Sequence, residues 1–180
     1  DKTSCSYGFA YMFPPDFIGS DDEHDILYVQ NNFGTNELYI KQTDHTGRGG
    51  HLYLYTGEAG YSSAIEIGSM PDTWIWITAR HNTGGAGSPH RLRAYNLLTG
   101  AQIGSEQTRT SHATEPSYQV SLGSAIGALV GHNGSLFFDD FVMDWTTATF
   151  PLGPVIYMPT VATRIPFKGS FGRRRARYGM

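Results

Sequence analysis

Short stretches of alternating apolar and polar residues recur along the first 145 residues, and clusters of turn-forming residues separate them. No segment carries apolar residues at the 3.6-residue period of a helix over several turns. The pattern therefore predicts scarce helix and an antiparallel sandwich or barrel, with the glycine-rich connections of a jelly roll. The expected strands are residues 6–12, 25–30, 37–42, 51–56, 63–67, 73–80, 90–95, 101–105, 118–122, 124–130 and 135–145.

The stretch 73–80 is apolar on both sides of the expected strand. Trp74 and Trp76 fall on one face, and Ile75 and Ile77 fall on the other. A strand with two apolar faces belongs in the interior of a sandwich.

Composition supports this fold class. The 180 residues include 22 glycines, 11 tyrosines, 10 phenylalanines and 3 tryptophans, which favours strands and tight turns. Cys5 is the single cysteine, so no internal disulfide can form. We recognise neither a membrane-spanning run nor a signal peptide.

Charge divides the chain into two parts. Residues 1–150 carry 7 basic and 16 acidic residues, a formal charge of −9, whereas residues 151–180 carry 6 basic residues and no acid. We therefore expect a β-sandwich domain at 1–150 and an extended, Pro/Arg-rich C-terminal arm at 151–180 that has its own partner.

Five motifs follow one another in the order seen in a known superfamily: residues 7–15 (YGFAYMFPP), 36–40 (NELYI), 72–80 (DTWIWITAR), 91–96 (RLRAYN) and 139–145 (DDFVMDW). Together they resemble successive strands of the laminin-G-like, concanavalin A-like lectin and glucanase jelly roll, over residues 6–146. The resemblance implies a lectin-like β-sandwich in which calcium is often bound. Such domains usually begin with a further strand, and its absence here leads us to expect an unpaired sheet edge.

Asp139 and Asp140 interrupt the aromatic strand at 135–145. Strand parity places Asp139 with Phe137, Phe141 and the other odd-numbered apolar residues, where a carboxylate would be costly to bury. A β-bulge that bends the strand and turns both carboxylates toward turn amides is the favoured interpretation. A calcium site at Asp139 and Asp140 is the alternative, and no other cofactor is expected.

Candidate acid catalysts are few. Glycoside hydrolases that resemble this fold carry a Glu-x-Asp-x-x-Glu signature, because a retaining mechanism needs two carboxyl groups about 5 Å apart. That signature is absent, and its nearest approach is Asp21, Glu23 and Asp25, which we expect in a solvated loop that enters the strand at 25–30. We therefore expect no hydrolytic activity.

Some aromatic residues could bind a sugar. Tyr53, Tyr55, Tyr61 and Trp76 could stack on sugar rings, although a place in the core is the commoner fate of aromatics in a sandwich. The seven histidines show no metal-binding spacing, and most are expected in loops.

The arm is the basis of the functional prediction. Prolines at 151, 154, 159 and 166 exclude a helix, and residues 155–165 are apolar enough to add a strand to an open sheet edge. The residues expected to contact a partner are Val155, Ile156, Tyr157, Met158, Arg164, Arg173, Arg174, Arg175 and Arg177.

We therefore expect a non-enzymatic structural or decorating subunit of an oligomeric assembly, whose arm docks on a neighbouring copy. A phage or virus particle, with the protein decorating the capsid of a virion, is the first choice and an extracellular filament is the second. A carbohydrate-binding adhesion module is the alternative. A glycosidase or polysaccharide lyase is less favoured, and four arginines without a nucleic-acid-binding motif make a nucleic-acid partner unlikely.

Overall fold

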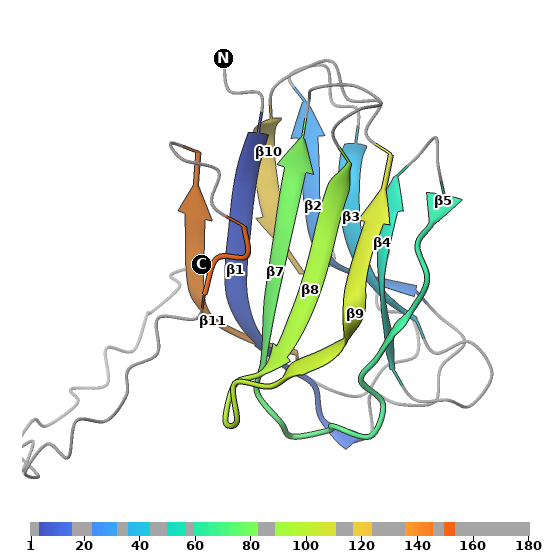
Figure 1. The fold of residues 1–180 in the computed structure, drawn as a ribbon, viewed down its shortest axis with the longest axis vertical. Helices are drawn as coiled ribbons and strands as arrows, with labels where there is room; N and C mark the ends of the chain where they lie inside the picture. Colours follow the sequence, from blue (N-terminus) through green and yellow to red (C-terminus); the bar gives the residue numbers. More distant parts are fainter. Residues whose placement is uncertain are drawn as a thin grey trace, which may run out of the picture.

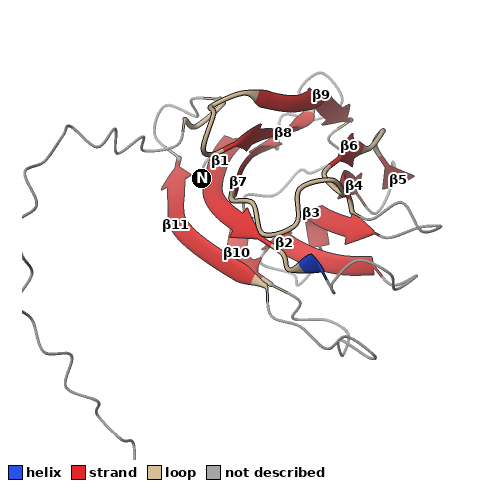
Figure 2. Cartoon of the chain, turned by 90° about the horizontal axis from the view of Figure 1, so that it is seen from below, coloured by secondary structure: helices blue, strands red, loops and turns tan. Residues whose placement is uncertain are grey.

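The computed structural model describes residues 4–15, 23–31, 36–43, 50–56, 60–82, 89–110, 117–123, 136–145 and 150–153. These residues form eleven strands and, apart from a helical turn at Pro15, no helix. The strands lie in two facing antiparallel sheets, so the fold is an all-β sandwich of the jelly-roll type (Figures 1 and 2).

The first sheet has five strands. Their spatial order is β11 (Phe137–Asp144), β1 (Ser4–Met12), β7 (Ile75–Asn82), β8 (His90–Asn96) and β9 (Gln102–Arg109). Strand β1 is paired on both sides, with β11 and with β7. Strand β1 is therefore an inner strand, and in the described part of the chain the edge strands of this sheet are β11 and β9.

The second sheet has six strands, and its main path ends at β5. The order is β10 (Ser117–Leu122), β2 (Glu23–Asn31), β3 (Asn36–Thr43), β4 (His51–Thr56) and β5 (Gly60–Tyr61), and β6 (Ile65–Glu66) also pairs with β4.

Most predicted strands are present in the structure. The bounds of β4 are those predicted, and β7 is central and buried over most of its length, as its two apolar faces indicated. The predicted strand at 63–67 shortens to the two residues of β6. The predicted strand at 124–130 lies outside the described residues.

The core lies between the sheets and contains aliphatic and aromatic side chains from both. A polar contact also crosses the core: the phenol of Tyr11 on β1 donates a hydrogen bond to Oε1 of Gln42 on β3. Both side chains are buried, and burial raises the pKa of the Tyr11 phenol well above its usual value. This neutral hydrogen bond ties the two sheets together without a buried charge.

A β-bulge in β11 confirms the favoured interpretation of the two adjacent aspartates. Gly8 pairs with Val142 and Ala10 pairs with Asp139, so Phe9 alone faces the two residues Asp140 and Phe141. The backbone of Asp140 is left-handed, with φ of 50°. Such a residue at the first position of a bulge increases the local twist of the strand.

The bulge also corrects the predicted parity of β11. Before the bulge, Phe138 packs against the rings of Phe9 and Tyr11, and after it Met143 packs on the core. Because the inward positions change from even to odd numbers, Asp140 is the residue that an unbroken strand would have directed inward. The bulge leaves both Asp139 and Asp140 exposed.

The short segment 150–153 lies on the outer face of the first sheet. The Leu152 amide donates a hydrogen bond to Oγ1 of Thr78 (3.2 Å), and Nε1 of Trp76 donates one to the Leu152 carbonyl (2.8 Å). Residues 151–153 of the expected arm thus lie on the sandwich, and the rest of the expected arm, 154–180, lies outside the described residues.

Candidate functional site

Four tyrosines lie side by side across the second sheet. In the strand register Tyr28 of β2 pairs with Tyr39 of β3, Tyr39 pairs with Tyr55 of β4, and Tyr55 pairs with Tyr61 of β5. The register therefore places one tyrosine on each of four neighbouring strands. We call Tyr28, Tyr39 and Tyr55, whose side chains the structure describes, the tyrosine row.

The tyrosine row lies on the outer face of the second sheet. In β3 and β4 the neighbours Leu38, Ile40 and Leu54 are buried in the core, and side chains alternate between the two faces of a strand. Tyr39 and Tyr55 are half-buried, whereas Tyr28 is 5% exposed. The part of the row that a ligand can reach is therefore centred on Tyr39 and Tyr55.

The rings of the tyrosine row contact one another. The centroids of Tyr28 and Tyr39 are 6.3 Å apart in a tilted arrangement, and those of Tyr39 and Tyr55 are 5.6 Å apart, edge to face. Both separations fall within the range of attractive aromatic pairs. The contacts restrict the ring orientations before any ligand arrives.

Lys41 lies over this row. Its ammonium nitrogen is 5.2 Å from the ring centroid of Tyr39 and 4.9 Å from that of Tyr55, and it is 3.5 Å from Oδ1 of Asp25 on β2. The side chains of Lys41 and Asp25 are only 16% and 9% exposed. A largely buried charge is costly unless a charge of opposite sign lies beside it, so Lys41 and Asp25 stabilise each other. The two rings add cation–π attraction to the Lys41 ammonium.

Tyr53 and His51 extend the same face along β4. Both are half-buried, as is Tyr55, and the rings of His51 and Tyr53 are 6.0 Å apart. Tyr53 pairs with Lys41 in the strand register. The outer face thus combines aromatic rings with an ammonium and a carboxylate group.

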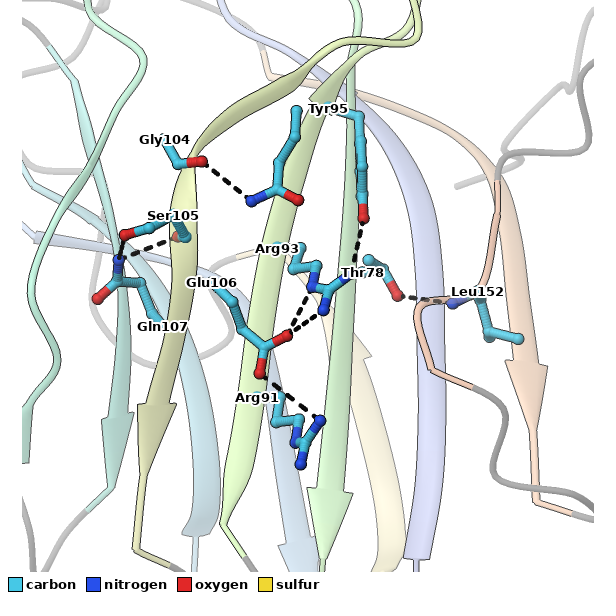
Figure 3. A network of polar contacts seen from close by, with 10 residues as sticks. Thr78, Arg91, Arg93, Tyr95, Gly104, Ser105, Glu106, Gln107 and Leu152 are labelled. Carbon is cyan, nitrogen blue, oxygen red and sulfur yellow. Dashed lines mark hydrogen bonds and ion pairs between the residues drawn. The ribbon is translucent and has the colours of Figure 1, made fainter.

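The outer face of the first sheet is built differently (Figure 3). Arg93 of β8 donates from Nε to Oε2 of Glu106 on β9 (2.6 Å), and from Nη1 to the hydroxyl of Tyr95 (3.4 Å). The hydrogen bond with Tyr95, followed by the contacts with Glu106, raises the pKa of Arg93 above its usual value. Nη1 of Arg91 lies 3.7 Å from Oε1 of Glu106, and the guanidinium of Arg93 lies 5.3 Å from the ring centroid of Phe150. On this outer face, Arg91, Arg93, Tyr95 and Glu106 therefore contact one another through their polar groups.

The structure divides the predicted sugar-binding aromatics. Tyr53 and Tyr55 lie on the outer face of the second sheet, and the backbone of Tyr61 places it next to Tyr55. Trp76 lies in the other sheet and is only 1% exposed. It is therefore buried in the protein and not available to stack on a sugar ring. Its ring is covered by Leu152 rather than offered to a sugar.

Sequence reasoning missed three residues of this face: Tyr28, Tyr39 and Lys41. The signal that could have found them is that the expected strands 25–30 and 37–42 contain one tyrosine each. Only the register of the sheet shows that these tyrosines are neighbours of Tyr55.

Three other sequence expectations concern acidic and partner-binding residues. Asp25 lies in β2, where a strand was predicted, but its side chain is buried against Lys41 rather than solvated. The side chains of Asp21 and Glu23 lie outside the described residues. Asp139 is exposed and its Oδ1 accepts a hydrogen bond from the Asp140 amide (2.8 Å), so a calcium ion there stays a prediction. In the described part of the chain, no three His, Cys, Asp or Glu side chains are grouped for a metal. The partner-binding residues at 155–177 lie outside the described residues.

Two histidines stack inside the first sheet. The rings of His81 on β7 and His90 on β8 are 5.0 Å apart and nearly parallel, at 14°, and both residues are 1% exposed. Desolvation, followed by repulsion from His90, lowers the pKa of His81 from 6.5 to about 3. His81 was expected in a loop, and its place in β7 makes it a neutral core residue.

Comparisons with known proteins add no family. No family model and no curated protein sequence matches this chain. Two solved structures are similar in part. The receptor-binding domain of botulinum neurotoxin mosaic serotype C/D has a TM-score of 0.43 and 14% identity over 79% of this chain, which spans a third (33%) of that domain.

The other solved structure is a tetrameric galectin from the ball sponge Cinachyrella sp. It has a TM-score of 0.42 and 16% identity, over 78% of this chain and 91% of the galectin. Likenesses this distant carry no argument about function. No helix among the described residues is long and apolar enough to cross a membrane.

Proposed function

We propose that the chain is a carbohydrate-binding module whose ligand lies on the outer face of the second sheet. The observation that carries the proposal is the alignment of Tyr39 and Tyr55 on adjacent strands, with Lys41 and Asp25 beside them. Aromatic faces pack against the C–H-rich faces of sugar rings, and charged side chains bind hydroxyl groups by charge-assisted hydrogen bonds.

The charged pair suits a neutral sugar. The Lys41 ammonium can donate hydrogen bonds to sugar hydroxyl groups, and the buried Asp25 carboxylate beside it offsets its charge. Because the two charges already offset each other, the face offers no net charge that would select an acidic sugar. The ring contacts of the tyrosine row hold the aromatic part in place, which lowers the entropic cost of binding.

We propose binding without hydrolysis. A retaining glycosidase needs a second carboxyl group about 5 Å from the first, and Asp25 on this face is instead tied to Lys41. Incubation of the protein with any glycan that it binds should leave the glycan intact, as judged by mass spectrometry. Release of shorter sugars that stopped in an Asp25→Asn variant would contradict this part of the proposal.

The binding face can be tested with two tyrosine variants. A glycan array identifies ligands, and calorimetry then compares the parent with Tyr39→Ala and Tyr55→Ala. We expect each variant to lose about 1.4 kcal/mol or more of binding free energy, a tenfold rise in Kd, because each removes a stacking face.

Tyr95→Ala is the matched control. Tyr95 is also half-buried on an outer face, but it lies on β8 of the first sheet. The control should bind with the parent's affinity, while circular dichroism shows that all three variants are folded. An array without a ligand, or a ligand that both row variants bind as tightly as the parent does, would overturn the proposal.

A structural subunit of a larger assembly is the second candidate function. The observation in its favour is that edge strand β11 exposes Phe137 and Phe141 along its length. Its test is the mass of the purified protein by light scattering, because a subunit whose arm docks on a neighbour must be larger than a monomer. A monomer at all accessible concentrations would remove this candidate.

A further inference from the structure

Three of the four large hydrophobic side chains that are exposed in the described chain lie on edge strand β11 or at its end. The large hydrophobic residues that are exposed are Leu98 and three aromatics of this strand or its end: Phe137 (44%), Phe141 (42%) and Trp145 (47%). We call these three aromatics, together with Asp139 and Asp140, the β11 edge surface. A sheet edge with exposed aromatics is a site where another segment docks.

The charge of this surface argues against a second copy of β11 as its occupant. Residues 136–145 contain three aspartates and no basic residue, and Asp139 and Asp140 are both exposed. Two copies of β11 paired edge to edge would bring like charges together in the middle of the strand, which destabilises a cross-strand pair. The occupant should therefore be apolar and basic.

The chain itself approaches this edge. Phe150 lies against Arg93 of β8, whereas Leu152 lies against Trp76 of β7 and close to Gly8 of β1. The segment thus runs across the first sheet from β8 toward β11. From β7, the β11 strand is two strand spacings away, about 10 Å, which about three extended residues can span.

The residues that follow have the required chemistry. Segment 154–180 begins with the apolar stretch 155–158 and carries six basic residues and no acid. We propose that this segment docks on the β11 edge surface of its own chain, with residues 155–158 on the exposed aromatics and its basic residues near Asp139 and Asp140. Because the segment is already tethered beside the site, its effective concentration there exceeds that of a neighbour's arm in dilute solution.

This proposal does not depend on carbohydrate binding. It competes with the second candidate function, in which the same arm leaves for a neighbouring copy. One experiment separates the two.

The experiment uses the 180-residue chain with a specific protease site inserted after Gly153, so that the arm is cut only after folding. The cut protein is passed through gel filtration in about 1 M salt, where the Debye length falls to about 3 Å, to remove the arm. Acrylamide quenching of Trp145 is measured before and after, and a Trp145→Phe variant provides the contribution of the other tryptophans. We expect quenching of Trp145 to increase when the arm is removed.

A second arm of the experiment uses uncut variants. Asp139→Asn with Asp140→Asn removes both exposed charges, and asparagine tolerates the left-handed backbone of Asp140. We expect the double variant to show increased Trp145 quenching at low salt. Asp72→Asn is the matched control, because Asp72 is also exposed, with φ of 55°, but lies outside β11; it should behave as the parent does.

Unchanged Trp145 quenching in protein shown by mass spectrometry to lack the arm would overturn the proposal. Association in trans is tested by mixing tagged and untagged copies and capturing the tag. Capture of untagged copies that depends on the arm would also overturn it, in favour of docking on a neighbour.

Discussion

The outer faces of the two sheets both carry aromatic residues, but these residues differ in exposure. On the first sheet, Trp76 is 1% exposed because residues 150–153 of the same chain cover it, whereas on the second sheet Tyr39 and Tyr55 remain half-buried. A ligand can therefore reach Tyr39 and Tyr55 but not Trp76. Aromatic content alone therefore does not identify a binding face, because the course of one short segment decides which aromatics a ligand can reach.

Small side chains explain why the first face can be covered. Gly8 of β1 leaves the space in which the Trp76 ring lies, and a Cβ built on Gly8 would be 2.6 Å from Cζ2 of that ring. The backbone of Leu152 then satisfies the Trp76 Nε1 group. The first sheet is thus covered on both sides at Trp76, whereas Tyr39 and Tyr55 of the second sheet have one accessible side.

Acid should have the largest effect on the first sheet. Below about pH 6.5 the unfolded chain takes up a proton at His81, which the folded chain takes up only near pH 3. The free energy of unfolding should therefore fall as the pH falls between these values, by up to about 1.4 kcal/mol per pH unit from this residue. Denaturant unfolding of the parent and of His81→Gln across this range should show a steeper slope for the parent. Equal slopes would mean that the His81 ring is accessible to water in the folded protein.

Removal of Trp76 should lower the free energy of unfolding more than removal of Tyr55, which is half-buried on the second sheet. Trp76→Ala should lower the free energy of unfolding by about 3–5 kcal/mol, because it opens a cavity under Leu152. Tyr55→Ala should lower it by about 1 kcal/mol or less, as expected for a cross-strand pair on an accessible face. Chemical denaturation measures both. Similar losses in the two variants would show that the two faces are equally buried.

Added volume at Gly8 should have the next largest effect. Gly8→Ala should cost about 1–3 kcal/mol, because the new methyl group would overlap the Trp76 ring. The matched control is Gly153→Ala, since a Cβ there would meet nothing within 4 Å. Thermal unfolding of the two variants distinguishes them, and a Gly8→Ala protein as stable as the control would contradict the tight cover.

The ion pair at Arg91 should contribute least. Its Nη1 is 3.7 Å from Glu106, and the Arg91 side chain is 41% exposed, so Arg91→Gln should change the free energy of unfolding by about 0–1 kcal/mol. A larger loss would mean that the ion pairs of Figure 3, and not Trp76 and Leu152, hold this face together.

Strand periodicity predicts the fold class well, because burial of one face imposes a period of two on most strands. It fails where the backbone departs from that period: no alternation shows that Asp140 begins a bulge and reverses the inward positions of β11. The proposed binding face is only half predicted from the sequence for a related reason. Tyr53 and Tyr55 share one strand, but their neighbours Tyr39 and Lys41 depend on a register that pairs distant parts of the chain.

The position of β1 also has a consequence for how the molecule is made. The first strand of the described chain lies between β7 and β11, so its two partners begin at residues 75 and 137. During synthesis, the apolar strand β1 therefore has both of its edges paired only after residues 137–144 have been made. Such long-range pairing is slow, so we expect refolding followed by stopped-flow fluorescence to take milliseconds to seconds. Refolding within microseconds would show that a local structure forms first.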